Sequence, residues 1–216
     1  MPKQSNLDRA LENHRRALAA CRRCGHESHV QPIVSLARRT RVMLVGQAPG
    51  KVETGGGRAF AGRAGQTLFR WFARVGLDEK TARERIYIAA ITRCYPGPSP
   101  SGRGDRVPSP SERANCSGWL DEELRLLKPK VLIPVGRLAI ERFLPKLPLD
   151  ELIGREHSVS LQGQETIAIP LPHPSGASSW IHQGNHGALL SRALEMIGTR
   201  LAEQGILCLP NARSVA

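Results

Sequence analysis

Residues 41–50 read RVMLVGQAPG, an apolar run that ends in glycine and continues as a loop. A continuous apolar run without polar alternation is typical of a strand buried on both faces of a parallel sheet. Similar runs at 86–91, 130–135 and 166–171 predict three more strands like the one at 41–46. Apolar residues at helical spacing predict helices at 6–20, 66–75, 111–127, 137–143 and 186–204, the third capped by Ser111. Strands that alternate with helices predict a three-layer α/β/α fold around a four-stranded parallel sheet.

Each predicted strand is followed by a loop of unusual composition. The loops begin GQAPG at residue 46, TRCYPGP at residue 92, GRLA at residue 136 and PHPSG at residue 172. Because ligands of parallel sheets gather beyond the carboxyl ends of the strands, we expect an active site where these four loops meet.

The chain of 216 residues is long enough for one well-buried domain and scarcely for two. We therefore expect a single domain over 1–216. In it, 1–40 supplies an N-terminal helix and the first two cysteines, and 209–216 forms a flexible tail. No stretch resembles a secretion signal or a membrane span, which predicts a cytoplasmic protein. A monomer is the default expectation.

Basic residues dominate the charge of the chain. There are 31 Lys and Arg residues against 19 Asp and Glu residues, a formal net charge of +12. Such an excess in a small domain favours a nucleic acid as partner, because neutralised phosphates release their counterions. A membrane surface is the alternative, but it calls for Trp or Phe on the apolar face of an amphipathic helix, and the N-terminal helix has neither.

Four cysteines are spaced as metal ligands. Cys21 and Cys24 form a CxxC turn after the first helix, Cys94 ends the second strand, and Cys116 lies in the helix that follows. Four thiolates suit either zinc or an iron–sulfur cluster. A disulfide, a redox CxxC and buried free thiols are the alternatives, and a disulfide is disfavoured in a cytosolic chain.

Three further residues bear on whether the cysteines bind a metal and on which metal it is. His26 and His29 follow the CxxC turn and would be candidate ligands if the metal were zinc. Cys208 lies beyond the last predicted helix, and we expect it to be a plain apolar residue.

Two motifs resemble the signatures of a known family. Residues 46–53 (GQAPGKVE) and 57–66 (GRAFAGRAGQ) resemble the loop GEAPGxxE…GRPFVGxAG of family 4 uracil-DNA glycosylases, and residues 173–175 (HPS) resemble the second signature of that superfamily. The four cysteines match the cluster ligands of family 4 in order and context. The resemblance covers about 20–201. It implies a [4Fe-4S] cluster rather than zinc, and a base-excision enzyme that removes uracil from DNA and leaves an abasic site.

The chain departs from the family pattern at several positions. Gln47 stands where family 4 has an acid, and Ala48 where the family 1 loop GQDPY has its catalytic Asp. Ala90 replaces an Asn that reads the edge of uracil. The loop between the last two cluster cysteines is long and carries Arg103, Asp105 and Arg106. It lacks the His that, in a related X-type branch, bonds covalently to the abasic sugar.

These departures leave two alternatives open. The protein could remove another deaminated base, such as hypoxanthine or xanthine, because Ala90 relaxes the reading of the base edge. It could also be a non-catalytic binder of abasic or damaged DNA, because the usual acids are missing. In either case DNA is the expected partner, and a bacterial protein of this kind would sit at the nucleoid.

The resemblance and the chemistry of base removal assign roles in the predicted site. His173 is expected to donate to uracil O2 and stabilise the departing anion, while Gln47 and Ala48 offer backbone N–H groups. Phe60 is the expected stacking ring. Glu53 is the nearest acid for positioning water, or pairs with Arg58 or Arg63. The full set expected to bind the base is Gly46, Gln47, Ala48, Phe60, Ala90 and His173.

DNA contacts are expected around the same loops. Candidates for phosphate binding are Arg103, Arg106, Ser175, Ser178 and Ser179. His182 and His186 are weaker candidates of the same kind. Trp180 either wedges into the duplex or packs its own loop.

Overall fold

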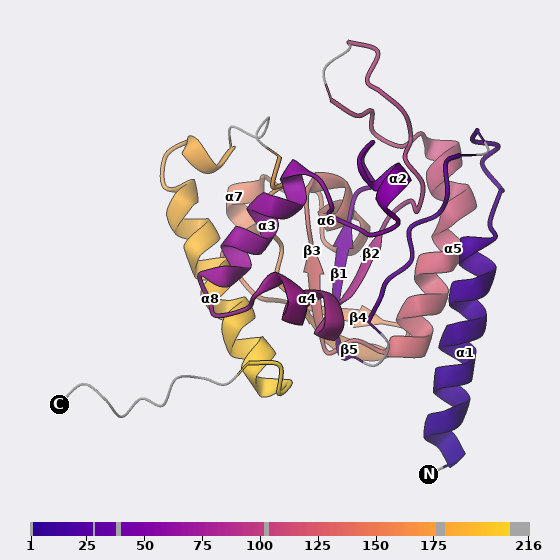
Figure 1. Cartoon of the computed structure of the whole chain (residues 1–216). Coiled ribbons are helices and arrows are strands. Elements are labelled where there is room, and N and C mark those ends of the chain that lie inside the picture. The colour runs from indigo at the N-terminus through magenta and orange to yellow at the C-terminus, as the bar shows by residue number, and fades with distance from the viewer. Residues whose placement is uncertain (1, 28, 38–39, 102–103, 176–179, 208–216) are drawn as a thin grey trace.

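The computed structural model describes residues 2–27, 29–37, 40–101, 104–175 and 180–207. In this part of the chain a five-stranded sheet has the order β2-β1-β3-β5-β4 (Figure 1). Its strands are β1 (Val42–Gly46), β2 (Tyr87–Ala90), β3 (Val131–Pro134), β4 (His157–Leu161) and β5 (Gln164–Ala168). The first four in spatial order run parallel, and β4 runs antiparallel to β5.

The expectation of four strands is wrong by one, because β4 was missed. This edge strand pairs with β5 from His157 opposite Ala168 to Leu161 opposite Gln164. The two strands are joined at Gln162 and Gly163, which both have positive φ, as a tight hairpin turn requires. The sequence HSVSL alternates polar and apolar residues, since one face of an edge strand is exposed. The strand has no continuous apolar run, and so the sequence pattern did not predict it.

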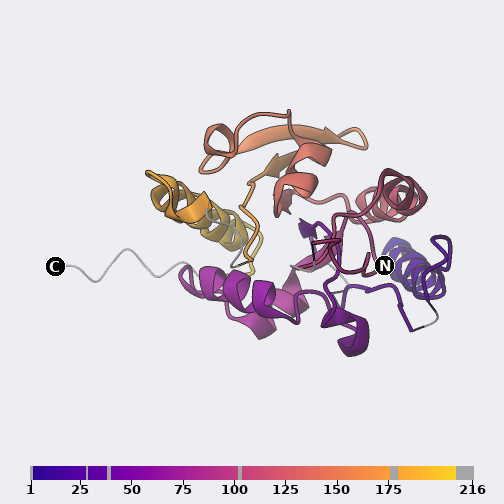
Figure 2. The ribbon, with the colours of Figure 1, turned by 90° about the horizontal axis from the view of Figure 1, so that it is seen from above.

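Helices cover both faces of the sheet (Figures 1 and 2). The described helices are α1 (Pro2–Ala19), α2 (Glu53–Gly56), α3 (Arg63–Ala73), α4 (Glu79–Arg85), α5 (Pro110–Leu127), α6 (Arg137–Phe143), α7 (Leu149–Leu152), the 3-10 turn Trp180–His182 and α8 (His186–Glu203). Alternate residues of β1 point to opposite faces: Val42 and Leu44 pack with α3, α4 and α8, whereas Met43 and Val45 pack with α1, α5 and α6. No described helix is long and apolar enough to cross a bilayer.

Helix α5 begins one residue earlier than expected, at Pro110, and its cap is Ser109 rather than Ser111. The Ser109 hydroxyl accepts from the Glu112 backbone N–H at 3.2 Å, and the Glu112 carboxylate accepts from the Ser109 N–H at 2.7 Å. Pro110 occupies the first helical position, where a missing N–H costs nothing. This reciprocal pair is a capping box.

A buried ion pair joins the helix layer to the sheet. Arg93, which follows β2, bonds through Nη2 to the Glu123 carboxylate on α5, and both side chains are almost fully buried. Glu123 also accepts from Tyr87 of β2 at 2.7 Å and contacts His14 Nε2 of α1 at 3.2 Å. Burial disfavours the carboxylate, but the Arg93 charge and these hydrogen bonds outweigh it and hold the pKa of Glu123 below its usual range.

The network predicts a large effect of neutralising its centre. Glu123→Gln leaves the Arg93 guanidinium buried without a counter-ion, and we expect a loss of about 3–5 kcal/mol in the free energy of unfolding. Urea denaturation followed by circular dichroism measures it. Glu122→Gln is the matched control, because its carboxylate pairs with Arg125 on the exposed side of the same helix and such a pair contributes about 0–1 kcal/mol. Equal losses in the two variants would show that the buried pair contributes no more to the free energy of unfolding than the exposed pair does.

Candidate active site and cysteine pocket

A cavity of about 740 Å³ lies at the carboxyl end of the sheet. The loops after β1, β2 and β5 form its walls, and Val135 closes it beyond β3. Its size is typical of a ligand site, and the loops meet at the edge of the sheet where the sequence predicted. Of the residues expected to act in catalysis, bind the base or contact DNA, those that line it are Gly46, Gln47, Ala48, Glu53, Phe60, Ala90, Arg106, His173 and Ser175.

Phe60 is held in an unusual backbone conformation beside the sheet. Its φ of 54° lies in the left-handed region that residues other than glycine seldom adopt. Arg83, which is buried, donates to the Ala59 carbonyl at 2.7 Å and to the Phe60 carbonyl at 3.0 Å. A Cβ at Gly65 would lie 1.8 Å from the Phe60 carbonyl oxygen, so only glycine fits there. The ring packs against the end of β1, with Cζ 3.1 Å from where a Cβ of Gly46 would be.

Arg83 was not predicted as a site residue because α4, the helix that carries it, was not predicted from the sequence. That helix reads EKTARER and has no apolar stripe, so its periodicity is weak. The available signals were Asp78 as a cap, which accepts from the Thr81 N–H at 2.9 Å, and the i,i+4 pair of Glu79 with Arg83.

Glu53 is buried and bonds to the backbone of its own loop. Its Oε1 accepts from the N–H of Ala61 at 2.9 Å and of Gly62 at 3.1 Å. These hydrogen bonds take the place of the pairing with Arg58 or Arg63 that the sequence left open. The carboxylate therefore ties the GQAPGKVE segment to the segment that carries Phe60.

His173 is oriented by the backbone around it. The Ser175 N–H donates to His173 Nδ1 at 3.2 Å, so the neutral ring carries its proton on Nε2. Gly136, with a φ of 83°, lies under the ring: a Cβ there would be 3.0 Å from His173 Cδ2. Burial lowers the pKa of His173 below its ordinary value of 6.5. At neutral pH the side chain is thus an uncharged donor.

The floor of the cavity is made by the ends of β1 and β2. Gly46 and Ala90 are partners across these strands. Beyond them, the Ile91 N–H donates to the Gly46 carbonyl at 3.0 Å and the Thr92 N–H to the Gln47 carbonyl at 3.2 Å. The loop therefore follows β2 for two more residues. Ala90 lines the cavity, and its side chain is a methyl group with no hydrogen-bonding atom.

Two of the five candidate DNA contacts line the cavity, and the other three lie outside the described residues. Ser175 lines the cavity, and Arg106 lines it while its guanidinium binds the Glu112 carboxylate at 2.7 and 2.6 Å. Arg103, Ser178, Ser179, Cys208 and the tail 209–216 lie outside the described residues.

Trp180 packs within its own segment. Its ring stacks on His186, with centroids 4.1 Å apart and an interplanar angle of 12°. His186 Nδ1 also contacts the Trp180 carbonyl at 2.8 Å. This geometry favours packing over a wedge as the role of Trp180.

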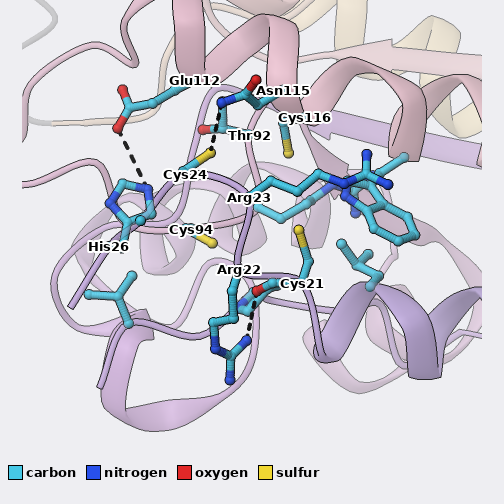
Figure 3. Close-up of a pocket in the computed structure, with 16 residues that line it drawn as sticks. Cys21, Arg22, Arg23, Cys24, His26, Thr92, Cys94, Glu112, Asn115 and Cys116 are labelled. Carbon is cyan, nitrogen blue, oxygen red and sulfur yellow. Dashed lines mark hydrogen bonds and ion pairs between the residues drawn. The ribbon is translucent and has the colours of Figure 1, made fainter. Parts of the chain in front are cut away.

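The four cysteines predicted to be ligands line one pocket (Figure 3). All four are free thiols, so the disulfide alternative does not apply to them. Figure 3 shows the sulfur atoms of Cys21, Cys24, Cys94 and Cys116 around a common space. Burial, and then the charges of the other three thiols, raises the pKa of Cys94 to about 12. Deprotonating the set therefore calls for positive charge in the pocket.

The histidines after the CxxC turn are engaged with acids. His26 Nε2 lies 3.6 Å from Glu112 Oε1, and His29 Nδ1 lies 3.3 Å from Glu27 Oε2. Among the described residues, no three His, Cys, Asp or Glu side chains are grouped closely enough to hold a single metal ion.

Arg93 lines both the cysteine pocket and the cavity. Its Nε and Nη1 are buried and have no hydrogen-bond partner in the described part of the chain. Burial raises the pKa of Cys116, and the Arg93 guanidinium and backbone N–H partly offset that rise. The positive charge of Arg93 is therefore close to the Cys116 thiol.

Sequence comparison places these features in a family. The family model of the uracil DNA glycosylase superfamily matches residues 34–198. The chain belongs to this superfamily. That span contains the Phe60 loop, Ala90 and His173, whereas Cys21 and Cys24 precede it.

Several relatives of this superfamily member are curated glycosylases. It is 27% identical to the type-4 uracil-DNA glycosylase of Archaeoglobus fulgidus, over 77% of this chain and 82% of the relative. It is 30% identical to the type-4 enzyme of Thermotoga maritima, over 63% of this chain and 65% of the relative, just under two thirds. A type-5 uracil-DNA glycosylase of Pyrobaculum aerophilum is 37% identical over 46% of each chain.

The burial of His173 predicts a pH dependence. Its pKa in the folded protein lies below 6.5, so on acidification the unfolded state takes up the proton first, and stability falls from about pH 6.5 downward. NMR titration of the ring, assigned by comparison with His173→Gln, should give a midpoint below 6.5. A midpoint at or above that value would contradict the neutral donor.

Proposed function

We propose that the protein hydrolyses the N-glycosidic bond of uracil in DNA and leaves an abasic site. The observation that carries this is His173, a neutral donor fixed by the Ser175 N–H in the same cavity as the Phe60 ring. The superfamily match supports it, as do the names of the type-4 relatives. The net charge of +12 supports a DNA substrate.

The target nucleotide must leave the base stack to enter the cavity. Phe60 would stack on the flipped base, and the positively charged surface would hold the neighbouring phosphates. For the phosphate contacts we propose Ser175 and Arg106, with Arg103, Ser178 and Ser179 on segments outside the described residues.

The bond from C1′ to the base breaks with its electron pair on the leaving base. His173 Nε2–H would donate to uracil O2, where the negative charge develops, and the N–H groups at Gln47 and Ala48 would add to this stabilisation. Water then forms the new bond to C1′ and loses a proton, and the base anion takes up a proton. Catalysis comes from contacts that strengthen as the charge appears.

A second candidate function rests on Ala90. Because its methyl group cannot hydrogen-bond to the base edge, the cavity also suits another deaminated base such as hypoxanthine or xanthine. A panel of oligonucleotides carrying uracil, hypoxanthine or xanthine tests which bases are released. A non-catalytic binder of abasic or damaged DNA would release none.

We also propose that the four thiols hold a [4Fe-4S] cluster rather than zinc. A pocket lined by four cysteines fits such a cluster, and the N–H groups of Arg93 Nε and Nη1, which have no partner among the described residues, would be available as donors to its sulfur atoms. Hydrolysis needs no electron transfer, so the cluster would serve to join the N-terminal segment to the loop 94–116. A single-domain monomer in the bacterial cytoplasm is the matching proposal for organisation and location.

The metal proposal predicts brown protein with about four irons per chain after anaerobic purification. Cys21→Ala should bleach it, because it removes one thiolate. Metal analysis and the visible absorption spectrum measure both. Stoichiometric zinc without iron would overturn the proposal.

The catalytic proposal predicts a ranking of variants. His173→Ala should lower the single-turnover rate on uracil-containing DNA about a hundredfold or more, as loss of an anion-stabilising donor does. Gln47→Ala should cost less, since its backbone N–H survives. Phe60→Ala should lose stacking of about 1–3 kcal/mol, mainly in binding. Near wild-type rates for His173→Ala would refute anion stabilisation by this residue.

A further inference from the structure

Asp105 brings a carboxylate into the catalytic cavity from a loop distant in sequence. It lies between β2 and α5 and lines the same cavity as His173 and Phe60. Two hydrogen bonds hold its hairpin: the Ser99 N–H donates to the Gly104 carbonyl at 2.9 Å, and the Arg106 N–H donates to the Gly97 carbonyl at 3.1 Å. The side chain is thus carried on paired backbone.

The Asp105 carboxylate meets the loop after β1 at Gly50. A Cβ at Gly50 would lie 3.0 Å from Asp105 Oδ2 and 2.8 Å from Glu53 Oε2. Glycine at this position lets both carboxylates approach the backbone. The other oxygen of Glu53 is bound by the Ala61 and Gly62 N–H groups, so Glu53 is fixed in place. Asp105 is exposed, and the Tyr95 phenol hydrogen-bonds to it.

This position matters because the loop after β1 lacks an acid where water would be activated. Gln47 and Ala48 are both uncharged. Glu53 has Oε1 engaged by backbone and is buried. Asp105 is the cavity-lining carboxylate that is open to solvent, and hence to water.

We propose that Asp105 is the catalytic carboxylate that positions and deprotonates the attacking water, with Glu53 as a positioning residue beside it. This assignment rests on the proposed glycosylase function. As the C1′–N bond breaks, its electron pair leaves with the base. The water oxygen bonds to C1′ and its proton passes to Asp105, which later returns it to solvent while the base anion gains a proton. A negative carboxylate also stabilises the cationic sugar.

The test compares variants of the full-length, metal-loaded protein on a uracil-containing duplex. Asp105→Asn should lower the single-turnover rate at saturating enzyme by about a hundredfold, the range of general-base catalysis. Its dissociation constant for a duplex with a non-cleavable 2′-fluoro uracil nucleotide should change by less than about threefold. Asp150→Asn, an exposed acid on α7 away from the cavity, is the matched control and should keep the wild-type rate.

Asp105→Ala provides a second measurement, whose expected result a folding defect would not produce. Added formate should restore part of its rate, since a free carboxylate can occupy the vacated space, and it should not accelerate the wild type. Asp105→Asn within about threefold of the wild-type rate, or no rescue of Asp105→Ala by formate, would overturn the assignment and leave the glycosylase function standing. A wild type that releases no uracil would instead overturn the proposed function and this assignment with it.

Discussion

The buried pair of Arg93 and Glu123 is the contact on which the two halves of the functional region depend. A guanidinium and a carboxylate out of water are tolerated only when each satisfies the other, so the segment after β2 has little freedom to shift against α5. That segment lies between Ala90, the last residue of β2, and Cys94. With His14 and Tyr87 bound to the same carboxylate, α1 is fixed to the sheet as well. The cavity and the cysteine pocket thus share one rigid boundary.

The cavity itself is built by close approach of backbone. Phe60 occupies a left-handed conformation, which carries a cost of order 1–3 kcal/mol that surrounding contacts must offset. Arg83 supplies them through two carbonyls, and Gly65 supplies the room. Gly136, which has no side chain, likewise leaves room beneath the ring of His173. Ring and imidazole are therefore placed by features that leave few alternative positions, as preorganised electrostatic catalysis requires.

The sequence predicted what depends on local patterns and on the chemistry of single residues. Apolar runs located β1, β2, β3 and β5, and the loops that follow them do meet at one edge. It did not predict β4, because an edge strand alternates polar and apolar residues. It did not predict α4, because a highly charged helix has little hydrophobic periodicity. Arg83 and Asp105 meet residues that are distant in sequence. Arg83 donates to the carbonyls of residues 59 and 60, and Asp105 lies beside Gly50. No local pattern encodes such contacts, since they arise only after the strands pair.

The strand order also dictates when a growing chain can acquire a complete cavity. β1 sits between β2 and β3, and β5 joins only beyond β3. A nascent chain that has made β1, β2 and β3 already holds Phe60 and Ala90, but it lacks His173 and leaves the edge of β3 unpaired. Such an edge is a template for association with other chains. The β4–β5 hairpin, a local unit that pairs early, is what caps it. Completion of the catalytic cavity and protection of the sheet during synthesis therefore occur in the same step.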